Sequence, residues 1–490
     1  MVSGPPGSFG RGKVVALRYI STRGRAAPLE FDEVLLEGLA RDGGLYVPEA
    51  WPKMSADEIA ELAGMSYVEV ARRVMGPYVS AESAEALPEI IDRAYAAFRD
   101  PAVAPLVPLE ADGELNGGLH LMELFHGPTL AFKDVAMQVL GGLFEHVLAR
   151  RDRRITIVGA TSGDTGSAAI EAIRGRSRAK IFILHPHGRT SEVQRRQMTS
   201  VEADNVFNLA IQGTFDDCQD LVKAMFNDTA FRDRVDLSGI NSINWARLMP
   251  QIVYYFTAAL SLHGSEAGTR PTSFSVPTGN FGDAFAGYAA AKMGLPLARL
   301  IVASNSNDIL TRVINTGDHT LGQVTRTLAP SMDIQISSNF ERLLFDLLDR
   351  DGSAVDEKMR QLKATGSFRL EPERLARARQ LFSAHRIDEP LTLATMRHAH
   401  TADGQMLDPH TAIGLAAAHR ELEAAPGLRT APMVVLGTAH PAKFPDAVEQ
   451  ATGHRPNLPE FLDDLYQRDE HFEVLPNDLA TVQQWISQRS

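Results

Sequence analysis

The sequence is poor in the groups on which disulfide-bonded, thiolate-metal and membrane-spanning proteins depend. Cys218 is the single cysteine among 490 residues, so neither a disulfide within the chain nor a thiolate cluster can form. No stretch approaches the roughly 18 apolar residues of a membrane-spanning helix. Residues 1–12 are rich in Gly, Pro and Ser and lack the apolar core of a signal peptide. We expect a disordered tail at 1–12 and a cytoplasmic protein without a membrane partner.

Positive charge is also scarce. The chain has 49 Lys and Arg against 61 Asp and Glu, a formal net charge of -12. No broad basic surface is then available, which argues against nucleic acid as a partner, and an anionic substrate needs a local basic pocket. Hydrophobic residues make up 44% and charged residues 22%, as in ordinary globular proteins. At about 100 to 200 residues per domain, the length predicts more than one domain.

Several catalytic signatures are missing. There is no Walker A motif, no nucleophile-elbow Gly-x-Ser-x-Gly and no His-Glu-x-x-His, and the glycines near position 163 do not match the dinucleotide-binding spacing. Two pairs of closely spaced histidines lack a third ligand at a recognisable distance. We predict no metal site and interpret the paired residues as loop or surface histidines: His185 with His187, and His398 with His400.

Short apolar runs alternate with helical patterns through the middle of the chain. Runs such as Arg154–Gly159, Phe207–Gln212 and Met433–Gly437 are typical of buried parallel strands joined by right-handed helical connections. The pattern predicts an α/β fold. We divide it into a small N-terminal domain at 13–105, an α/β core formed by 106–348 and 387–490, and a charged, helical peripheral segment at 349–386.

Lys133 lies in an apolar stretch that directly follows a turn. Leu130, Ala131 and Phe132 precede it, and Val135 begins the apolar residues of the helix that follows. A lysine in this position is either a solvated charge with an apolar stem or a reactive amine whose pKa is lowered by burial and by neighbouring positive charge. The local sequence favours the solvated charge, but two distant loops favour the reactive amine.

The two loops each join a strand to a helix. Gly279–Asp283 presents backbone N–H groups at the positive end of a helix, as a phosphate cradle does, provided that the Asp283 carboxylate points away. A tight turn with a helix cap is the alternative. The loop Thr161–Thr165 offers hydroxyls and amides suited to a carboxylate. A lysine, a phosphate cradle and a carboxylate loop are the parts that pyridoxal phosphate chemistry needs.

The motifs resemble those of the threonine synthase family, in the longer class of bacteria and fungi, within the tryptophan-synthase-β-like group of fold-type II pyridoxal phosphate enzymes. The matching segments cover nearly the whole chain outside the tail. They are the Schiff-base motif His126–Asp134, the carboxylate loop Ser162–Gly166, the phosphate loop Pro277–Asp283, the pyridine-side segment Leu436–Lys443, and Tyr19–Gly24, Gly43–Pro48 and Asn241–Arg247. The resemblance implies three layers with mostly parallel sheets.

The resemblance also implies residue roles. Lys133 is expected to hold pyridoxal phosphate, with Phe132 beside it, and Thr438 is expected to hydrogen-bond the pyridine nitrogen. The cofactor phosphate is assigned to Gly279, Asn280, Phe281, Gly282 and Asp283, and the substrate carboxylate to Thr161, Ser162, Gly163, Asp164 and Thr165. From charge and motif position, the residues expected to hold the substrate phosphate are Asn244, Arg247 and Lys443.

The reaction implied is the conversion of O-phospho-L-homoserine and water to L-threonine and phosphate. Lys133 would take the α proton and then a β proton, phosphate would leave from Cγ, and water would add at Cβ. Two alternatives remain open at this point: a serine or threonine dehydratase using the same cofactor, and a non-catalytic paralogue that binds phosphorylated amino acids. We expect a monomer or a homodimer.

Overall fold

The computed structural model describes residues 17–109 and 118–490, so the predicted tail at 1–12 lies outside the described residues. Its largest sheet has six strands, all parallel except for β3, which is antiparallel to β4. The order is β13 (Phe382–Arg386), β10 (Leu297–Ser304), β9 (Thr272–Pro277), β14 (Met433–Gly437), β4 (Leu119–Glu123) and β3 (Leu106–Pro108).

The second large sheet is wholly parallel. Its order is β15 (Glu473–Pro476), β7 (Val206–Gln212), β6 (Ala179–Pro186), β5 (Ile155–Ala160) and β8 (Leu237–Ser238). The middle strands are buried on both faces, which explains their continuous apolar runs. The two sheets confirm the predicted α/β class with mostly parallel strands.

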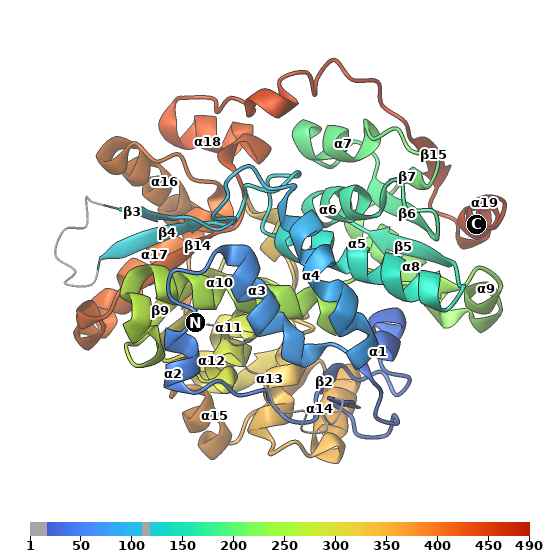
Figure 1. Ribbon diagram of the computed structural model, residues 1–490. Coiled ribbons are helices and arrows are strands. Elements are labelled where there is room, and N and C mark those ends of the chain that lie inside the picture. The colour runs from blue at the N-terminus through green and yellow to red at the C-terminus, as the bar shows by residue number, and fades with distance from the viewer. Residues whose placement is uncertain (1–16, 110–117) are drawn as a thin grey trace, which may run out of the picture.

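Two long helices lie near the middle of the molecule (Figure 1). They are α5 (Lys133–Arg150) and α10 (Trp245–His263), and both are apolar around most of their circumference, as buried helices must be. One hydrophobic core includes residues of both helices together with Met122 from the six-stranded sheet and Ile157 from the five-stranded sheet. The helices therefore fix the position of one sheet relative to the other.

The N-terminal region packs into this same core. Strands β1 (Tyr19–Ser21) and β2 (Tyr46–Pro48) pair antiparallel, and the four helices are α1 (Phe31–Glu37), α2 (Ala56–Ala60), α3 (Tyr67–Met75) and α4 (Ala81–Tyr95). Reciprocal capping boxes begin α2 and α3. The rings of Tyr19 and Tyr78 lie 5.8 and 5.6 Å from that of Trp245 on α10, so this region shares its aromatic core with the sheets.

The segment 349–386, predicted to be helical, contains two short strands as well as helices. It contains the helices α14 (Gly352–Thr365) and α15 (Pro372–Ala378), and between them β12 (Ser367–Arg369), which pairs with β11 (Asp318–Thr320). Residues 382–386 are strand β13, paired parallel with β10 at the edge of the six-stranded sheet. The helical prediction is wrong there because an edge strand buries only alternate residues, and its charged neighbours hide the alternation.

The remaining helices pack on the sheets or on one another. They are α6 (Asp164–Ile173), α7 (Glu192–Thr199), α8 (Phe215–Asn227), α9 (Thr229–Arg234), α11 (Gly282–Met293), α12 (Ile309–Thr316), α13 (Phe340–Leu347), α16 (Glu389–Asp403), α17 (Pro409–Ala424), α18 (Pro445–Thr452) and α19 (Leu479–Ser487). Short 3-10 turns are found at Gly76–Tyr78, Gly264–Gly268, Pro330–Met332, Pro426–Thr430, Pro441–Lys443 and Glu460–Leu462.

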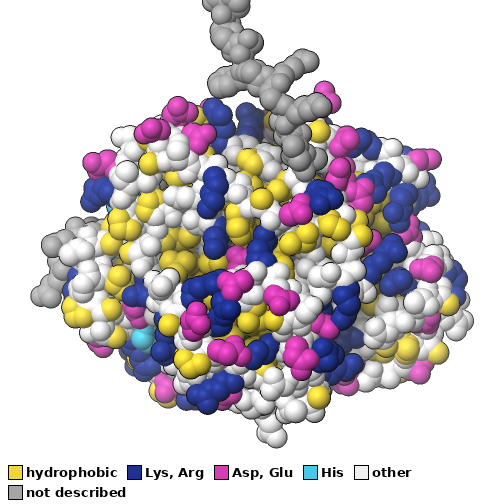
Figure 2. Space-filling view, turned by 90° about the horizontal axis from the view of Figure 1, so that it is seen from below, with side chains coloured by type: hydrophobic (Ala, Val, Ile, Leu, Met, Phe, Trp, Pro, Cys, Tyr) yellow, Lys and Arg dark blue, Asp and Glu magenta, His cyan; other side chains and the backbone are white. Residues whose placement is uncertain are grey.

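The surface carries charges of both signs. Figure 2 shows basic and acidic side chains interspersed over one face, without a broad area of either sign. Among the helices of the described residues, none combines the length and the apolar character needed to cross a bilayer.

Candidate active site

Loops that follow four parallel strands converge at the carboxyl ends of the two sheets. The loop after β4 is joined to the loop after β14 by two backbone hydrogen bonds: Phe132 N–H donates to Thr438 O at 2.9 Å, and His440 N–H donates to Leu130 O at 3.0 Å. The loops after β5 and β9 supply Asp164 and Asp283, whose pKa values both respond to the charge of Lys133. This edge is where parallel α/β sheets bind ligands.

A tight turn places Lys133 at the first position of α5. The Thr129 N–H and hydroxyl both donate to the buried carboxylate of Asp134, at 2.8 and 2.7 Å. Gly127 permits this turn, since a Cβ atom there would lie 2.5 Å from Cβ of Asp134. Leu130 adopts a left-handed conformation with φ 62°. The turn directs Lys133 toward the loop edge, with its ammonium 4.6 Å from the ring centre of Phe132.

Lys133 is enclosed, with 11% of its side chain exposed, and its Nζ lies 3.4 Å from Oδ2 of Asp164. Burial lowers the pKa of Lys133; Asp164 opposes the shift, and the positive charges of Lys443 and Arg247 add to it. Lys133 is therefore a buried amine and not a solvated charge, and burial and neighbouring positive charge both lower its pKa.

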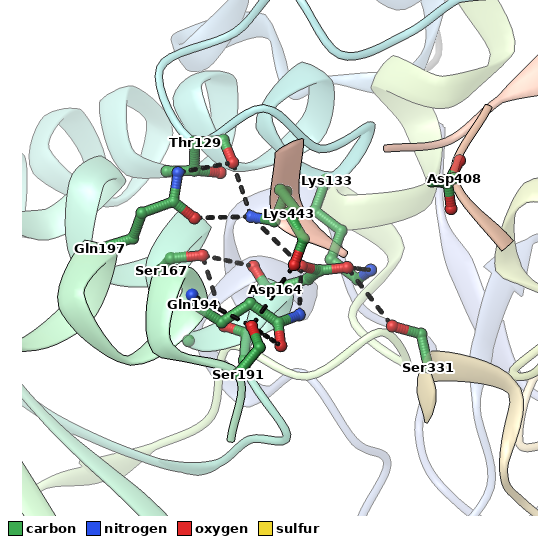
Figure 3. A network of polar contacts seen from close by, with 12 residues as sticks. Thr129, Lys133, Asp164, Ser167, Ser191, Gln194, Gln197, Ser331, Asp408 and Lys443 are labelled. Carbon is green, nitrogen blue, oxygen red and sulfur yellow. Dashed lines mark hydrogen bonds and ion pairs between the residues drawn. The ribbon is translucent and has the colours of Figure 1, made fainter. Parts of the chain in front are cut away.

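Asp164 lies between two lysines (Figure 3). Its Oδ1 is 3.2 Å from Nζ of Lys443 and accepts a 2.8 Å hydrogen bond from Gln194, while the Ser331 hydroxyl donates to Oδ2 at 3.3 Å. Burial raises the pKa of Asp164, but Lys443, Lys133, His410 and the Gln194 hydrogen bond outweigh it and hold that pKa well below its usual range. Asp164 is thus an ionised carboxylate shared by two ammonium groups.

Lys443 is buried completely and already satisfied. Its Nζ donates to Thr129 O at 2.6 Å and to Oε1 of Gln197 at 2.7 Å, in addition to its ion pair with Asp164 (Figure 3). An ammonium group has three N–H donors, so these protein acceptors can engage all of them. The arrangement does not favour the prediction that Lys443 grips the substrate phosphate.

The loop after β5 owes its shape to Thr161 and Gly163. The Thr161 hydroxyl oxygen accepts from the N–H groups of Gly163 at 3.0 Å and Gly166 at 2.9 Å. Gly163 has φ 147°, and a Cβ atom there would lie 2.5 Å from the Gln194 side chain, so only glycine fits. Within the described part of the chain, several N–H groups of this loop have no protein acceptor and remain available to a carboxylate: those of Ser162, Asp164 and Thr165.

The loop after β9 has the geometry of an anion cradle. Phe281 is left-handed at φ 61°, and its N–H donates to the Thr278 hydroxyl at 3.0 Å. A Cβ atom at Gly279 would lie 2.9 Å from Ser331 O, so a side chain would crowd the loop. No acceptor in 17–109 or 118–490 takes the N–H groups of Gly279, Asn280 or Gly282. These amides, at the start of α11, fit a phosphate group.

Two side chains of this loop face inward. The Phe281 ring packs 5.7 Å from that of Phe340 and 5.6 Å from that of Phe382, within the core. The Asp283 carboxylate accepts from the Thr278 hydroxyl and from Ala284 N–H at 2.9 Å, and burial raises the pKa of Asp283 to about 6. The Asp283 carboxylate therefore points onto its own loop and away from the free amides, as a phosphate cradle requires.

Thr438 is supported by a buried network that the sequence motifs do not indicate. Asp408 caps α17; it accepts from His410 Nδ1–H at 2.7 Å and from the Thr411 hydroxyl. Thr411 Oγ1 in turn accepts from Thr438 N–H at 3.1 Å, and Nε2 of His410 accepts from Ser331 N–H at 3.3 Å. The Asp-Pro start of α17 signals a helix cap, but nothing local signals these partners.

The side chains of Arg247 and Asn244 differ in how fully they are hydrogen-bonded within the protein. The Arg247 guanidinium, 3% exposed, donates to Ile240 O at 3.0 Å, while its Nε has no hydrogen-bond partner among the described residues. Burial lowers the pKa of Arg247 to about 10, and no described carboxylate pairs with it. Asn244 uses its amide to bond Leu35 O at 2.8 Å and to cap Ala246 N–H at 3.0 Å. Of the two residues, Arg247 is the one with a buried donor left without a partner in the described part of the chain, which makes it the better candidate for an anion.

Within the described ranges, no group of three His, Cys, Asp or Glu side chains is arranged to hold a metal ion. The predicted loop or surface position is wrong for His185, which is buried near the end of β6 because that strand continues to Pro186.

Family models match three consecutive parts of the chain. Residues 18–95 match "Threonine synthase N terminus", residues 99–361 match "Pyridoxal-phosphate dependent enzyme", and residues 411–486 match "Threonine synthase, C-terminal". The middle model spans Lys133 and the loops after β5 and β9, and the C-terminal model includes Thr438 and Lys443.

Individual relatives match over nearly the whole length. Threonine synthase of Pseudomonas aeruginosa is 53% identical over 474 residues, covering 96% of this chain and 98% of the relative. A pyridoxal-phosphate-bound threonine synthase from Brucella melitensis superposes with a TM-score of 0.91 at 54% identity, covering 97% and 99% of the two chains. Yeast threonine synthase gives a TM-score of 0.91 at 38% identity, covering 98% and 99%.

Proposed function

The chain belongs to the threonine synthase family of pyridoxal-phosphate-dependent lyases, and we propose that Lys133 carries the cofactor while Arg247 and the loop 161–165 receive the anionic groups of the substrate. The activity is the conversion of O-phospho-L-homoserine and water to L-threonine and phosphate. The observation that carries the residue assignment is a buried lysine of lowered pKa at the meeting point of the two helix N-termini.

The cofactor, when bound, supplies an electron sink for a carbanion next to the substrate nitrogen. The free N–H groups of Gly279, Asn280 and Gly282, at the positive end of α11, would hold its phosphate. The Thr438 hydroxyl would be the partner of its pyridine nitrogen, and a neutral partner of this kind would leave that nitrogen largely unprotonated. Thr438 can hold this position because its backbone is bonded on one side to Phe132 and on the other to Thr411.

Lys133 moves protons at its Nζ. Its lowered pKa provides a neutral amine that can take the α proton of the substrate. Nζ must then pass that proton back to the bound substrate and cofactor before it, as a neutral amine again, can take a β proton. Once Nζ is protonated, Asp164 at 3.4 Å stabilises the positive charge, which a buried lysine could not otherwise keep. Asp164 thus raises the pKa of Lys133, whereas Lys443 and Arg247 lower it.

The substrate presents a carboxylate and a phosphate. The free N–H groups of Ser162 and Thr165 at the start of α6 bind the carboxylate, and the unpaired guanidinium of Arg247 binds the phosphate. Asn244 contributes indirectly, by capping α10 and so placing Arg247, and Lys443 contributes by keeping Asp164 ionised. We also retain a cytoplasmic location and a monomer or homodimer.

Two lysine variants test the assignment. Lys133→Ala is expected to abolish both the visible absorbance of bound cofactor and phosphate release from O-phospho-L-homoserine. Lys223→Ala is the control, since the Lys223 side chain is 66% exposed and pairs with Asp220 on the surface of α8. A Lys133→Ala protein that still binds cofactor covalently overturns the assignment. Release of ammonia from L-threonine, measured alongside, distinguishes a dehydratase.

A further inference from the structure

Arg342 is a buried charge outside the site described above. It lies on α13, has no exposed surface, and in the described ranges no carboxylate lies within ion-pair distance of its guanidinium. Burial lowers the pKa of Arg342 to about 9, with only Glu341 opposing it. Such a group is costly to keep inside a protein unless its N–H donors are well used.

The donors of Arg342 join three segments that are far apart in the sequence. Nε donates to Tyr46 O at 3.0 Å, on β2 of the N-terminal region, and Nη2 donates to Ile243 O at 2.5 Å, in the turn before α10. Nη1 donates to Oδ1 of Asn339. One planar fork therefore fixes the relative positions of the N-terminal strand, the turn that leads to Arg247, and Asn339.

Asn339 extends the connection to the phosphate cradle. Its backbone N–H and its side-chain Nδ2 both donate to Asn280 O, at 3.1 and 3.0 Å, and Nδ2 also approaches Ser242 O at 3.3 Å. Asn339 is completely buried, so water cannot replace these bonds. The Asn280 carbonyl is thereby held toward α13, and the loop amides are left free for an anion.

We propose that Arg342 is a positioning residue that, through Asn339, holds the cofactor-phosphate loop in its binding shape and ties that shape to docking of the N-terminal region. The proposal rests on the assignment of 279–283 as the phosphate loop. Arg342 touches neither cofactor nor substrate; it sets the orientation of the 280–281 peptide and of the turn before α10. Loss of Arg342 should therefore weaken phosphate recognition more than it weakens the fold.

Arg350, three residues after the end of α13, provides a matched control. It donates to Pro48 O and Glu49 O, both at 2.5 Å, and pairs with Asp346. It thus secures the same N-terminal strand that Arg342 secures, but it makes no bond to Asn339 or to the phosphate loop. The two arginines separate docking of the N-terminal region from shaping of the loop.

The apoprotein is titrated with pyridoxal phosphate and, separately, with pyridoxal. The quantity compared between variants is the affinity for pyridoxal phosphate divided by the affinity for pyridoxal. That ratio isolates the phosphate site and needs no turnover. Arg342→Lys should lower the ratio by about 10-fold or more, the usual effect of losing a charge-assisted hydrogen bond. Arg350→Lys should leave the ratio within about 2-fold of wild type, although we expect a lower unfolding temperature in both variants.

A double-mutant cycle tests the route through Asn339. Asn339→Ala should lower the ratio as Arg342→Lys does. The ratio of the double variant should lie within about 2-fold of the lower of the two single-variant ratios, because both changes break the same connection. Arg350→Lys combined with Asn339→Ala should give the product of the two separate effects. Asn339→Ala also preserves a readout if Arg342→Lys fails to fold.

The outcomes are distinct. A lowered ratio in Arg342→Lys and Asn339→Ala, unchanged in Arg350→Lys, with non-additivity only in the first pair, supports the proposal. Equal ratios in all variants, with only the unfolding temperature lowered, overturn it and leave Arg342 a purely structural residue. A wild-type protein that binds pyridoxal as tightly as pyridoxal phosphate overturns the assignment of the phosphate loop itself.

Discussion

Asp164 and Asp283 occupy equivalent places in the two sheets but are in opposite electrostatic situations. Each is buried in the first turn of a helix that follows a parallel strand. The pKa of Asp164 lies well below its usual range because two ammonium groups flank it, whereas burial raises the pKa of Asp283 to about 6. The same residue type in the same local motif thus serves as a counterion in one loop and as a cap in the other.

The difference comes from residues that are remote in sequence. Lys133 and Lys443 reach Asp164 from the loops after β4 and β14, while the nearest partners of Asp283 are its own loop neighbours Thr278 and Ala284. A loop that must offer amides to a phosphate needs its carboxylate turned aside. A loop that adjoins a reactive amine needs its carboxylate ionised.

Replacing each aspartate by asparagine should show the largest difference between the two sites. Asp164→Asn leaves the buried Lys443 without its counterion, so we expect about 3 to 5 kcal/mol of destabilisation and at least a 100-fold loss of activity. Asp283→Asn should be no less stable than wild type at neutral pH, because an amide oxygen can accept the same two hydrogen bonds. Urea unfolding of both apoproteins measures the difference, and equal losses would contradict the account.

The pH dependence of stability should also separate the two sites. Asp283 keeps its proton in the folded state up to pH near 6 and loses it near pH 4 when unfolded, so its contribution to the unfolding free energy falls as pH rises through this window. Asp283→Asn lacks this contribution. Its stability relative to wild type should rise by about 1 to 3 kcal/mol from pH 4 to pH 7. A difference that stays constant with pH would rule out the raised pKa.

Lys443→Met should produce the smallest but most diagnostic change. Removing this positive charge raises the pKa of Lys133, so the rate at which the apoprotein attaches pyridoxal phosphate should reach its plateau at higher pH, by about one unit. Lys223→Met, on the exposed face of α8, should leave the profile unchanged. If Lys443→Met shifts the profile to lower pH, the electrostatic account of Lys133 fails.

The loops could be predicted from sequence because their chemistry is local. Glycine where a side chain would collide, as at Gly163 and Gly279, and a polar strand-to-helix junction are visible in consecutive residues. The alternation of strands and helices likewise follows from local periodicity, which failed for the short strands β12 and β13 in the segment 349–386.

The supporting partners could not be predicted in the same way. Gln194, Ser331 and His410 reach the site from a helix, a 3-10 turn and the start of another helix, and nothing in their own neighbourhoods indicates a partner. The satisfied state of Lys443 depends on Gln197 and on a backbone carbonyl, which no residue type discloses. Tertiary packing decides these contacts.

We propose that Lys133, and not Lys443 on the other side of Asp164, is the lysine that carries the cofactor. Borohydride reduction of the wild-type holoenzyme followed by peptide mapping tests this directly, since both lysines lie within 3.4 Å of the same carboxylate. We expect the pyridoxyl group on the peptide containing Lys133 and an unmodified Lys443. A pyridoxyl group on Lys443, or one divided between the two lysines, would contradict the account.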